Sequence, residues 1–387
     1  MSILRKVAIV FWIPFLMEAS AIPFFLIPIP GFPLSVGRTC LVVLGVIGVF
    51  YSGKHFISPY AKVVLMFVVA CFVGTFFSDN FLEDLLSFVG VASLWLASYS
   101  AASLLRLPET NILLKYFFYL VYGYWLIYIF NASLSGGEVV SYGEVYREGR
   151  EDDISLVNFH SFGLVFSVAL VFLAQLNGWL ASLKLVGIAF VLVGVTALFV
   201  TESRANFLIT LFVLICFYAL NNKIKLRTLL KVGVVLLAIG YTASYFMSRN
   251  ERLNRRFDVK NTDYIEASTS SRFEFIALTF EELLELPFGG GVRNTRVNYY
   301  GIEYQPHSQF LTIILFGGVG GIAANILWIK IFARTAFRVI KKRYKNCIPY
   351  LVASTVTMLS LLTNDISGAF FFLMLMFQIW LSKEVHA

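Results

Sequence analysis

Charged residues are scarce in this chain. Only 14% of its 387 residues are Asp, Glu, Lys or Arg, whereas about 25% is usual for a soluble domain. Hydrophobic residues make up 58% of the chain. A packed core does not need so many apolar residues, so most of them must face lipid. The composition therefore excludes an ordinary soluble globular protein and predicts a membrane protein.

Several functional motifs are also missing. The sequence has no Walker motif, no Gly-x-Gly-x-x-Gly and no Asp-x-Asp, so we expect neither ATP-driven chemistry nor a nucleotide-held Mg²⁺. The four cysteines show no Cys-x-x-Cys spacing, which predicts neither a metal site nor a disulfide framework. No segment interleaves basic and aromatic residues as a nucleic-acid surface does. We therefore expect no cofactor, no metal and no nucleic-acid partner.

Apolar segments recur along the chain at about the 20-residue length that an α-helix needs to cross a bilayer. The first resembles a signal peptide, because Arg5-Lys6 precedes an apolar stretch and Ala19-Ser20-Ala21, but Glu18 and Pro23 disfavour cleavage. We interpret it as an uncleaved first span. The predicted fold is an all-α polytopic membrane protein, a single transmembrane domain over 1–387. It has about twelve spans, at 7–27, 35–51, 60–77, 84–105, 112–131, 156–176, 183–200, 205–221, 230–247, 308–337, 348–363 and 367–382.

Lysine and arginine predict the orientation of these spans. With the N-terminus in the cytoplasm, most basic residues fall in inner segments, and Lys260 is the only outer lysine. Both termini are then cytoplasmic, and two large loops, 132–155 and 248–306, lie outside. The tenth segment is too long for one simple span. Its glycine cluster at 317–321 predicts a short helix, a break and then a full crossing.

Arg204 stands out on the predicted outer side. Thr201-Glu202-Ser203-Arg204 interrupts apolar sequence where the span 205–221 begins. An arginine guanidinium is always charged, and its planar fork matches phosphate oxygens in pairs. An interfacial arginine that merely reaches for water explains Arg204 equally well.

Arg272 lies in the larger outer loop. Ser271 and Glu274 form a potential capping box, which predicts a helix of about four turns with Arg272 in its first turn. There the helix dipole would add to the arginine charge and favour an anion. The alternative is that Arg272 pairs with Asp263 or Glu266. Apolar residues at helical spacing predict an amphipathic helix that lies on the membrane surface or packs on other spans: Phe273, Ile276, Ala277, Phe280, Leu283 and Leu284.

The end of the loop holds further candidates. Pro287 should end the amphipathic helix, and the glycines at 289–291 should form a turn, although glycines also let backbone N–H groups approach phosphate. Arg293 and Arg296 follow, either as phosphate or sugar contacts or as a solvated charge cluster.

His307 ends the loop, and an apolar helix starts directly after it. An imidazole beside a helix N-terminus is expected to be neutral, so it can take a proton from a sugar hydroxyl or donate a hydrogen bond to phosphate. The alternative is an interfacial histidine with no chemistry, which is weakened because His307 shares its predicted face with Arg204 and Arg272. Asp365, at another outer turn, could orient His307 or an arginine, although a helix N-cap is the preferred interpretation.

Two charges inside the membrane complete the candidates. Glu18 lies within the first span, and Arg38 opens the second. Ionisable residues within spans are functional candidates by default, but the sequence does not identify their partners.

In the 132–155 loop, acidic and basic residues alternate. A solvated loop explains that pattern, with sugar binding as the alternative.

These features resemble the O-antigen polymerase and ligase superfamily of bacterial envelopes. The similarity covers about 200–325, and each motif is unspecific alone, but their order, spacing and common predicted side make the set more specific. The residues that carry the resemblance are Thr201-Glu202-Ser203-Arg204-Ala205, Ser271-Arg272, Pro287-Phe288-Gly289-Gly290-Gly291, His307-Ser308, Gly318 and Gly321.

The resemblance implies a metal-independent, inverting membrane glycosyltransferase, similar to the class C type, in the bacterial inner membrane. Such enzymes take a glycan from undecaprenyl pyrophosphate at the periplasmic face. By resemblance, Arg204 and Arg272 hold the pyrophosphate leaving group, and His307 acts as base or as a phosphate contact. The candidate substrate-binding residues are Ser203, Arg293, Arg296 and Asp365. The implied partners are a lipid-linked oligosaccharide donor and acceptor and membrane lipid, with a chain-length regulator protein as a further candidate.

Polymerase and ligase are the two closest interpretations. A polymerase adds the glycan to the next lipid-linked repeat, and a ligase transfers it to lipid A core. The ligase pattern has Gly, Thr or Val where this chain has Ala324, and Ser308 replaces the commoner Asn. We favour the polymerase. A lipid-linked oligosaccharide flippase is a more distant alternative. Transporters gather charges near the midplane of the bilayer, whereas the candidate residues here gather at one interface. A non-catalytic scaffold would not need Arg204, Arg272 and His307 to converge.

Overall fold

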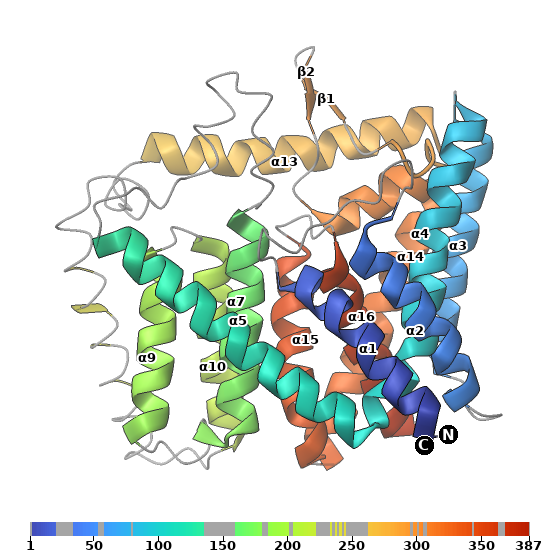
Figure 1. The fold of residues 1–387 in the computed structure, drawn as a ribbon. Helices are drawn as coiled ribbons and strands as arrows, with labels where there is room; N and C mark the ends of the chain where they lie inside the picture. Colours follow the sequence, from blue (N-terminus) through green and yellow to red (C-terminus); the bar gives the residue numbers. More distant parts are fainter. Residues whose placement is uncertain are drawn as a thin grey trace. The chain divides into compact units, whose positions relative to one another are not determined.

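A computed structural model describes most of the chain, and almost all of that part is helical (Figure 1). The described residues are 2–20, 34–52, 58–78, 80–134, 159–179, 185–200, 204–221, 262–294, 297–299, 302–304, 308–342, 344–362 and 368–386, with isolated residues between 233 and 244.

The described chain divides into two compact units. The first unit comprises Met1–Leu113, Ala267–Cys347 and Leu361–Ala387, and the second comprises Leu114–Glu266 and Ile348–Ser360. Elements of the first unit are α1 (Ser2–Ala19), α2 (Val36–Ser52), α3 (Tyr60–Phe76), α4 (Phe81–Ala101), η3 (Ala102–Arg106), β1 (Val297–Tyr299), β2 (Ile302–Tyr304), α14 (Gln309–Lys342), η5 (Lys345–Cys347), α16 (Ala369–His386) and most of α13 (Thr262–Glu285). Those of the second are most of α5 (Pro108–Leu134), α7 (Phe159–Leu176), α9 (Leu185–Val200), α10 (Arg204–Asn221) and α15 (Ile348–Ser360).

Helices occupy every predicted span except the ninth, 230–247, which lies outside the described residues apart from isolated positions. Within the described part, three helical segments are long and apolar enough to cross a membrane, Phe81–Arg106, Pro108–Asn131 and Gln309–Lys342. Shorter apolar helices accompany them. The structure is therefore consistent with an α-helical membrane protein, and the count of twelve spans stays a prediction. One departure from an all-helical fold is the antiparallel hairpin of β1 and β2, in which Val297 pairs with Tyr304.

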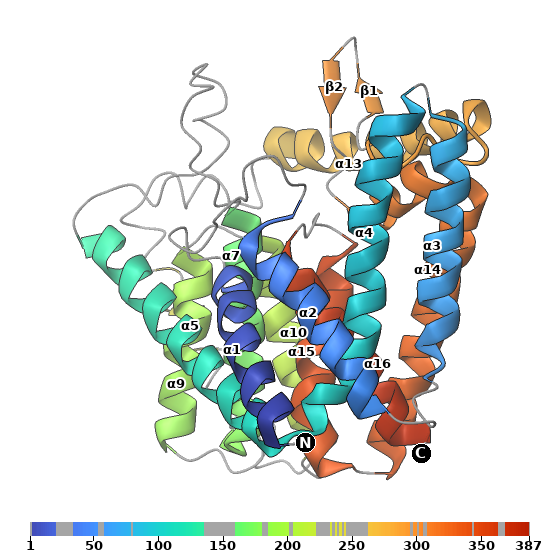
Figure 2. The ribbon, with the colours of Figure 1, turned by 45° about the vertical axis from the view of Figure 1, so that its right-hand side comes forward.

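An aromatic core joins four helices of the first unit. The Trp95 ring on α4 stacks on Phe67 of α3, with 4.0 Å between centroids. It also meets Trp328 of α14 and Phe371 of α16 edge-on or tilted, at 5.8 and 5.6 Å. Such pairs add to the burial of large apolar rings. Figure 2 shows α3, α4 and α14 running side by side.

Small residues let α3 and α14 approach closely. A Cβ atom placed at Gly317 or Gly320 would lie 2.8 Å from the Cβ of Ala70. One placed at Gly74 would lie 2.1 Å from the carbonyl oxygen of Phe316. Backbones in membrane helices pack tightly where residues are this small. The α3–α14 contact therefore depends on the glycines.

The predicted break in the tenth span is confirmed. Gly318 interrupts α14 with φ 56° and ψ −133°, which separates a short helix, 309–317, from a long one, 319–342. The turn that follows α13 fits into the break. Val319 donates its N–H to the Pro287 carbonyl at 2.9 Å, and Gly290 donates to the Leu315 carbonyl at 3.0 Å. Backbone groups released by the break thus find partners, as buried polar groups must.

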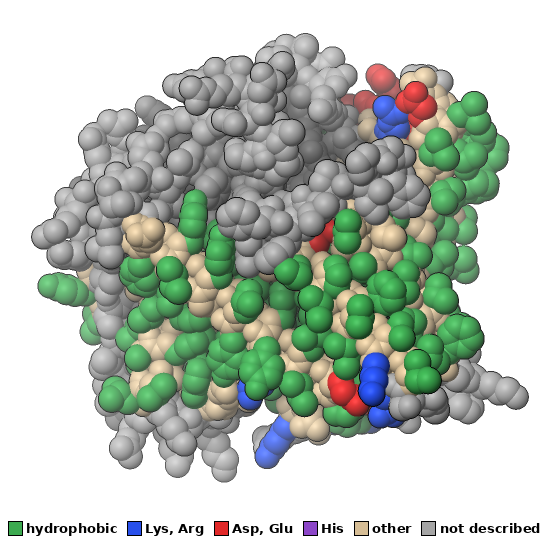
Figure 3. Space-filling view, in the orientation of Figure 1, with side chains coloured by type: hydrophobic (Ala, Val, Ile, Leu, Met, Phe, Trp, Pro, Cys, Tyr) green, Lys and Arg blue, Asp and Glu red, His purple; other side chains and the backbone are tan. Residues whose placement is uncertain are grey.

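Charged pairs mark the two ends of the first unit. Arg5 pairs with Glu109 at 3.7 Å and Arg106 with Glu384 at 2.7 Å, at the end where both chain termini lie (Figure 1). The pairs Arg38–Glu18 and Arg293–Glu83 involve the far end of α1 and the starts of α2 and α4. On the face shown in Figure 3, hydrophobic side chains cover the surface between the charged residues. This band is what a lipid-facing surface requires.

Candidate functional site

Arg204 is the first residue of α10, as the sequence predicts. Its side chain, together with Ser203, lies outside the described residues. Two positions later, the Asn206 amide is fully buried and accepts a hydrogen bond from the Ser360 hydroxyl, with 3.4 Å between the oxygens. This bond fixes the first turn of α10 to the last turn of α15 within the second unit. The sequence analysis did not select Asn206. A polar amide in the first turn of an otherwise apolar helix was the signal that would have identified it.

The predicted start of the helix at Arg272 is wrong. No capping box forms at Ser271 and Glu274, because α13 already begins at Thr262. The Ser and Thr residues at 268–271 lower helix propensity by only about half a kcal/mol each relative to Ala, too little to end a helix that continues on both sides. Arg272 therefore lies well inside α13, and its side chain is outside the described residues. The helix dipole gives it no help with an anion.

The apolar stripe of α13 is not its packing face. Phe273, Ile276, Phe280 and Leu284 are all exposed, Leu284 at 84%. The helix instead packs through its other side: Phe275 forms a small core with Val297 of β1 and Leu315 of α14, and Leu278 and Thr279 flank it. An exposed apolar stripe on a helix at one end of the first unit fits the prediction of a helix on the membrane surface.

The helix that follows His307 begins as predicted. His307 itself lies outside the described residues, but Ser308 is buried and α14 starts at Gln309. The Ser308 hydroxyl and the Gln309 N–H both donate to the carbonyl oxygen of Leu361, at 3.2 and 3.1 Å. These two bonds hold the first turn of α14 to the residue that follows α15.

Arg293 has carboxylate partners in the first turn of α4. Its backbone N–H donates to the Asp84 carboxylate at 3.2 Å, and its guanidinium pairs with Glu83. Asp84 is buried, whereas Glu83 is exposed. This geometry supports the interpretation of Arg293 as part of a charge cluster, and its contact with substrate stays a prediction. Sequence reasoning missed both carboxylates. Arg296 and Asp365 lie outside the described residues.

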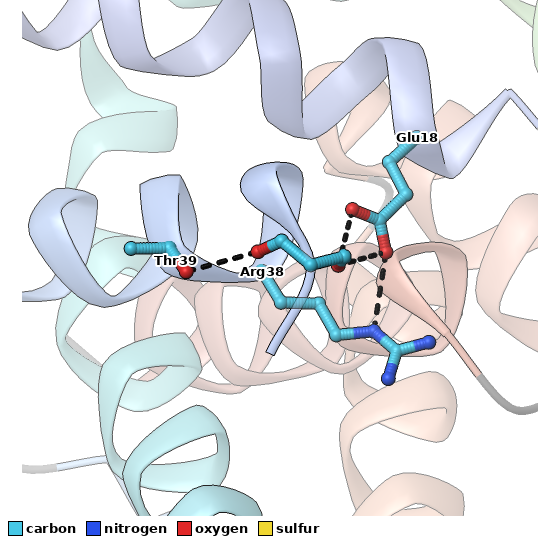
Figure 4. Close-up of polar contacts among 4 residues, drawn as sticks. Glu18, Arg38 and Thr39 are labelled. Atoms are coloured by element: carbon cyan, nitrogen blue, oxygen red, sulfur yellow. Dashed lines mark hydrogen bonds and ion pairs between the residues drawn. The ribbon is translucent and has the colours of Figure 1, made fainter. Parts of the chain in front are cut away.

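Glu18 and Arg38 are partners of each other (Figure 4). The Arg38 Nε donates to the Glu18 carboxylate at 3.1 Å. The hydroxyl of Ser35 lies 2.7 and 2.5 Å from the two carboxylate oxygens, so it donates to the same group. Thr39 in turn donates to the Ser35 carbonyl at 2.9 Å. A charge in the last turn of α1 is thus compensated by the start of α2.

The cysteines are free thiols: Cys40, Cys71 and Cys347 are buried and Cys216 is half-buried. Burial, and then the nearby Glu384 carboxylate, raise the pKa of the Cys347 thiol to about 11. A thiol with so high a pKa is a poor nucleophile at neutral pH. Among the described residues, no group of three His, Cys, Asp or Glu side chains could hold a metal ion.

Comparison with known families finds a match over the middle of the chain. Residues 188–326 match the family model described as O-Antigen ligase. The chain is thus similar to the O-antigen ligase family over this region. The match extends from α9 into α14 and includes Arg204, Arg272, the turn after α13, His307 and the Gly318 break. The resemblance to the O-antigen polymerase and ligase superfamily is therefore confirmed, and the O-antigen ligase family points to a membrane-embedded enzyme of the glycosyltransferase kind. No curated protein matches the chain.

Proposed function

We propose that this protein is a polymerase of lipid-linked polysaccharide repeat units, of the O-antigen or capsule kind. It transfers the growing glycan from undecaprenyl pyrophosphate to the next lipid-linked repeat. The observation that carries the proposal is the family match over 188–326, which spans the positions that sequence reasoning selected for anion chemistry. The reaction takes place at the periplasmic face of the inner membrane, with both termini in the cytoplasm. The common end of the two termini in the first unit supports that topology.

The chemistry is a displacement at the anomeric carbon of the donor sugar. The acceptor hydroxyl forms a bond to this carbon while the bond to the diphosphate oxygen breaks, so the configuration inverts. His307 takes the hydroxyl proton. The diphosphate leaves with the bonding electrons, and Arg204 and Arg272 stabilise the charge that it develops. The donor is already activated as a diphosphate ester, so the reaction needs neither ATP nor a metal ion.

The described structure supplies supports for these residues. The Leu361 carbonyl holds the start of α14, next to His307. The Pro287–Val319 and Leu315–Gly290 hydrogen bonds hold the C-terminal end of α13 against the break in α14. Arg272 lies well inside the same helix. Fixed donors and cations are more effective than mobile ones, because little reorganisation is needed during the reaction.

A ligase that passes the glycan to lipid A core is the second candidate, favoured by the description of the matching family. A deletion strain separates the two. One repeat on the lipid A core would mean that a polymerase has been lost, and no attached repeat would mean that a ligase has been lost.

Single replacements test catalysis directly. Arg204→Ala, Arg272→Ala and His307→Ala should each abolish long glycan chains on a gel while membrane protein levels hold. Arg106→Gln is the matched control, because it removes a partly exposed arginine at the end of the first unit that holds the termini. Chains of unchanged length in the His307 and Arg272 variants would overturn the proposal.

A further inference from the structure

The buried carboxylate of Glu18 needs an explanation. Only 4% of the residue is exposed, and residues 7–17 of the same helix, which lead up to it, are all apolar. Removing a carboxylate from water is strongly unfavourable, and a buried ion pair is often no more stabilising than apolar residues of the same size. Fold stability alone therefore gives little reason for Glu18. A residue of this kind within a membrane protein commonly serves a ligand site.

The backbone is built around this carboxylate. A Cβ atom placed at Gly37 would lie 2.5 Å from a Glu18 carboxylate oxygen and 2.9 Å from the Pro14 carbonyl. Glycine at this position lets the first turn of α2 approach the last turns of α1. The close approach brings Ser35 and Arg38 within hydrogen-bond distance of the same carboxylate.

The ion pair with Glu18 leaves the two Nη atoms of Arg38 available to bind a ligand. Glu18 binds Nε of Arg38, and no hydrogen bond joins either Nη atom to another side chain or carbonyl in the described ranges. The Arg38 side chain is 32% exposed, whereas its partner is almost completely buried. In Figure 4 the two Nη atoms point away from Glu18. Near them lies Gly368, whose added Cβ would come to 3.7 Å from one Nη.

Guanidinium nitrogens in this arrangement are suited to phosphate. A guanidinium presents two parallel N–H groups that match two oxygens of a phosphate. Glu18 fixes the opposite edge, so the side chain loses little freedom on binding. Arg38 lies in the first turn of α2 and Glu18 in the last turn of α1, at the end of the first unit that is opposite to the termini. The turn between α13 and α14 belongs to the same end.

We propose that Arg38, oriented by Glu18 and Ser35, binds the diphosphate of a second lipid-linked glycan, the acceptor. This inference rests on the proposed polymerase function, because a polymerase must hold two lipid diphosphates in one leaflet. Like charges repel, so the two diphosphates need separate cations. Arg204 and Arg272 serve the donor, and Arg38 serves the acceptor. Glu18 is a positioning residue that contacts no substrate.

The test counts bound lipids. The purified full-length protein in phosphatidylcholine nanodiscs is titrated with undecaprenyl diphosphate, and native mass spectrometry records how many molecules bind. The wild-type protein should bind two. The double variant Glu18→Gln/Arg38→Gln, which leaves no unpaired buried charge, should bind one. Arg38→Lys keeps the charge but loses the fork, so it should weaken the second binding event about tenfold.

A matched control removes another ion pair of the same unit. Arg106→Gln/Glu384→Gln, at the opposite end, should still bind two molecules. Equal binding by the two double variants, with unchanged melting temperatures, would show that the Glu18–Arg38 pair is structural only. Displacement of the second molecule by a tenfold excess of phosphatidylglycerol would show an ordinary headgroup site and overturn the acceptor assignment. A deletion strain with a ligase phenotype would sink the polymerase function, whereas the count of bound lipids would still judge Arg38.

Discussion

Replacing Gly318 by alanine should separate α13 from α14. Gly318 has φ 56° and ψ −133°, a region that side-chain-bearing residues rarely adopt. Its new Cβ would also lie 2.1 Å from the Pro287 carbonyl oxygen and 2.6 Å from the Gly289 nitrogen. The backbone strain costs about 1–3 kcal/mol. If the turn withdraws, the bonds Val319–Pro287 and Gly290–Leu315 are lost as well, at about 1 kcal/mol each.

The summed loss is about 3–5 kcal/mol, and thermal melting in detergent micelles measures it. Gly123→Ala is the matched control. Gly123 lies in α5, where a Cβ would meet no atom within 4 Å. Alanine there should stabilise the helix by up to about 1 kcal/mol, because glycine is the poorer helix former. If Gly318→Ala melts at the wild-type temperature, the turn after α13 does not depend on the break in α14, and the reasoning fails.

Two further predictions concern charged residues of the first unit. Asp84→Ala should lower the free energy of unfolding by about 1.5–3 kcal/mol, because it removes the buried carboxylate that accepts the Arg293 N–H. Glu83→Gln should lower it by less than about 1 kcal/mol, because the Glu83–Arg293 pair is exposed. Hydrogen exchange of the Arg293 amide would report the difference, and equal exchange in both variants would contradict the prediction. Lys383 lies just beyond the predicted span 367–382. Burial, and then repulsion from Arg106, lower its pKa to about 8 in the folded protein, against 10.5 ordinarily. The unfolded chain then binds more protons between these values, so the melting temperature should rise from pH 8 toward 10.5. Lys383→Met should remove that rise, and a slope that persists in the variant would assign it to another group.

Local patterns predicted much of the fold. Long apolar segments predicted the helices, and the glycines at 317–321 predicted the break in α14, because glycine readily adopts the conformation that a helix cannot continue through. Pro287 and the glycines after it predicted the turn that ends α13. These features depend on neighbouring residues, so the sequence contains them directly.

Features that depend on distant partners were not predictable in this way. The turn at Pro287 fits into the break near Val319, but no spacing rule joins the two. Glu18 could be recognised as unusual, while its pairing with Arg38 depends on how α1 and α2 rotate against each other. The apolar stripe of α13 left two placements open, on the membrane surface or against other spans, because lipid and protein can both cover such a stripe. Ser271 resembled a cap because the helix upstream of it carries no strong signal of its own.

The hydrogen bonds between Pro287 and Val319 and between Gly290 and Leu315 have an architectural consequence. They tie the turn after α13 to both sides of the Gly318 break, so the chain that leaves this turn at Gly290 comes back to it at Leu315. The β1–β2 hairpin lies inside that stretch of chain. A short epitope inserted between the two strands should therefore be accepted without disturbing the bundle, which offers an antibody handle for finding the side of the membrane on which the hairpin lies in intact cells.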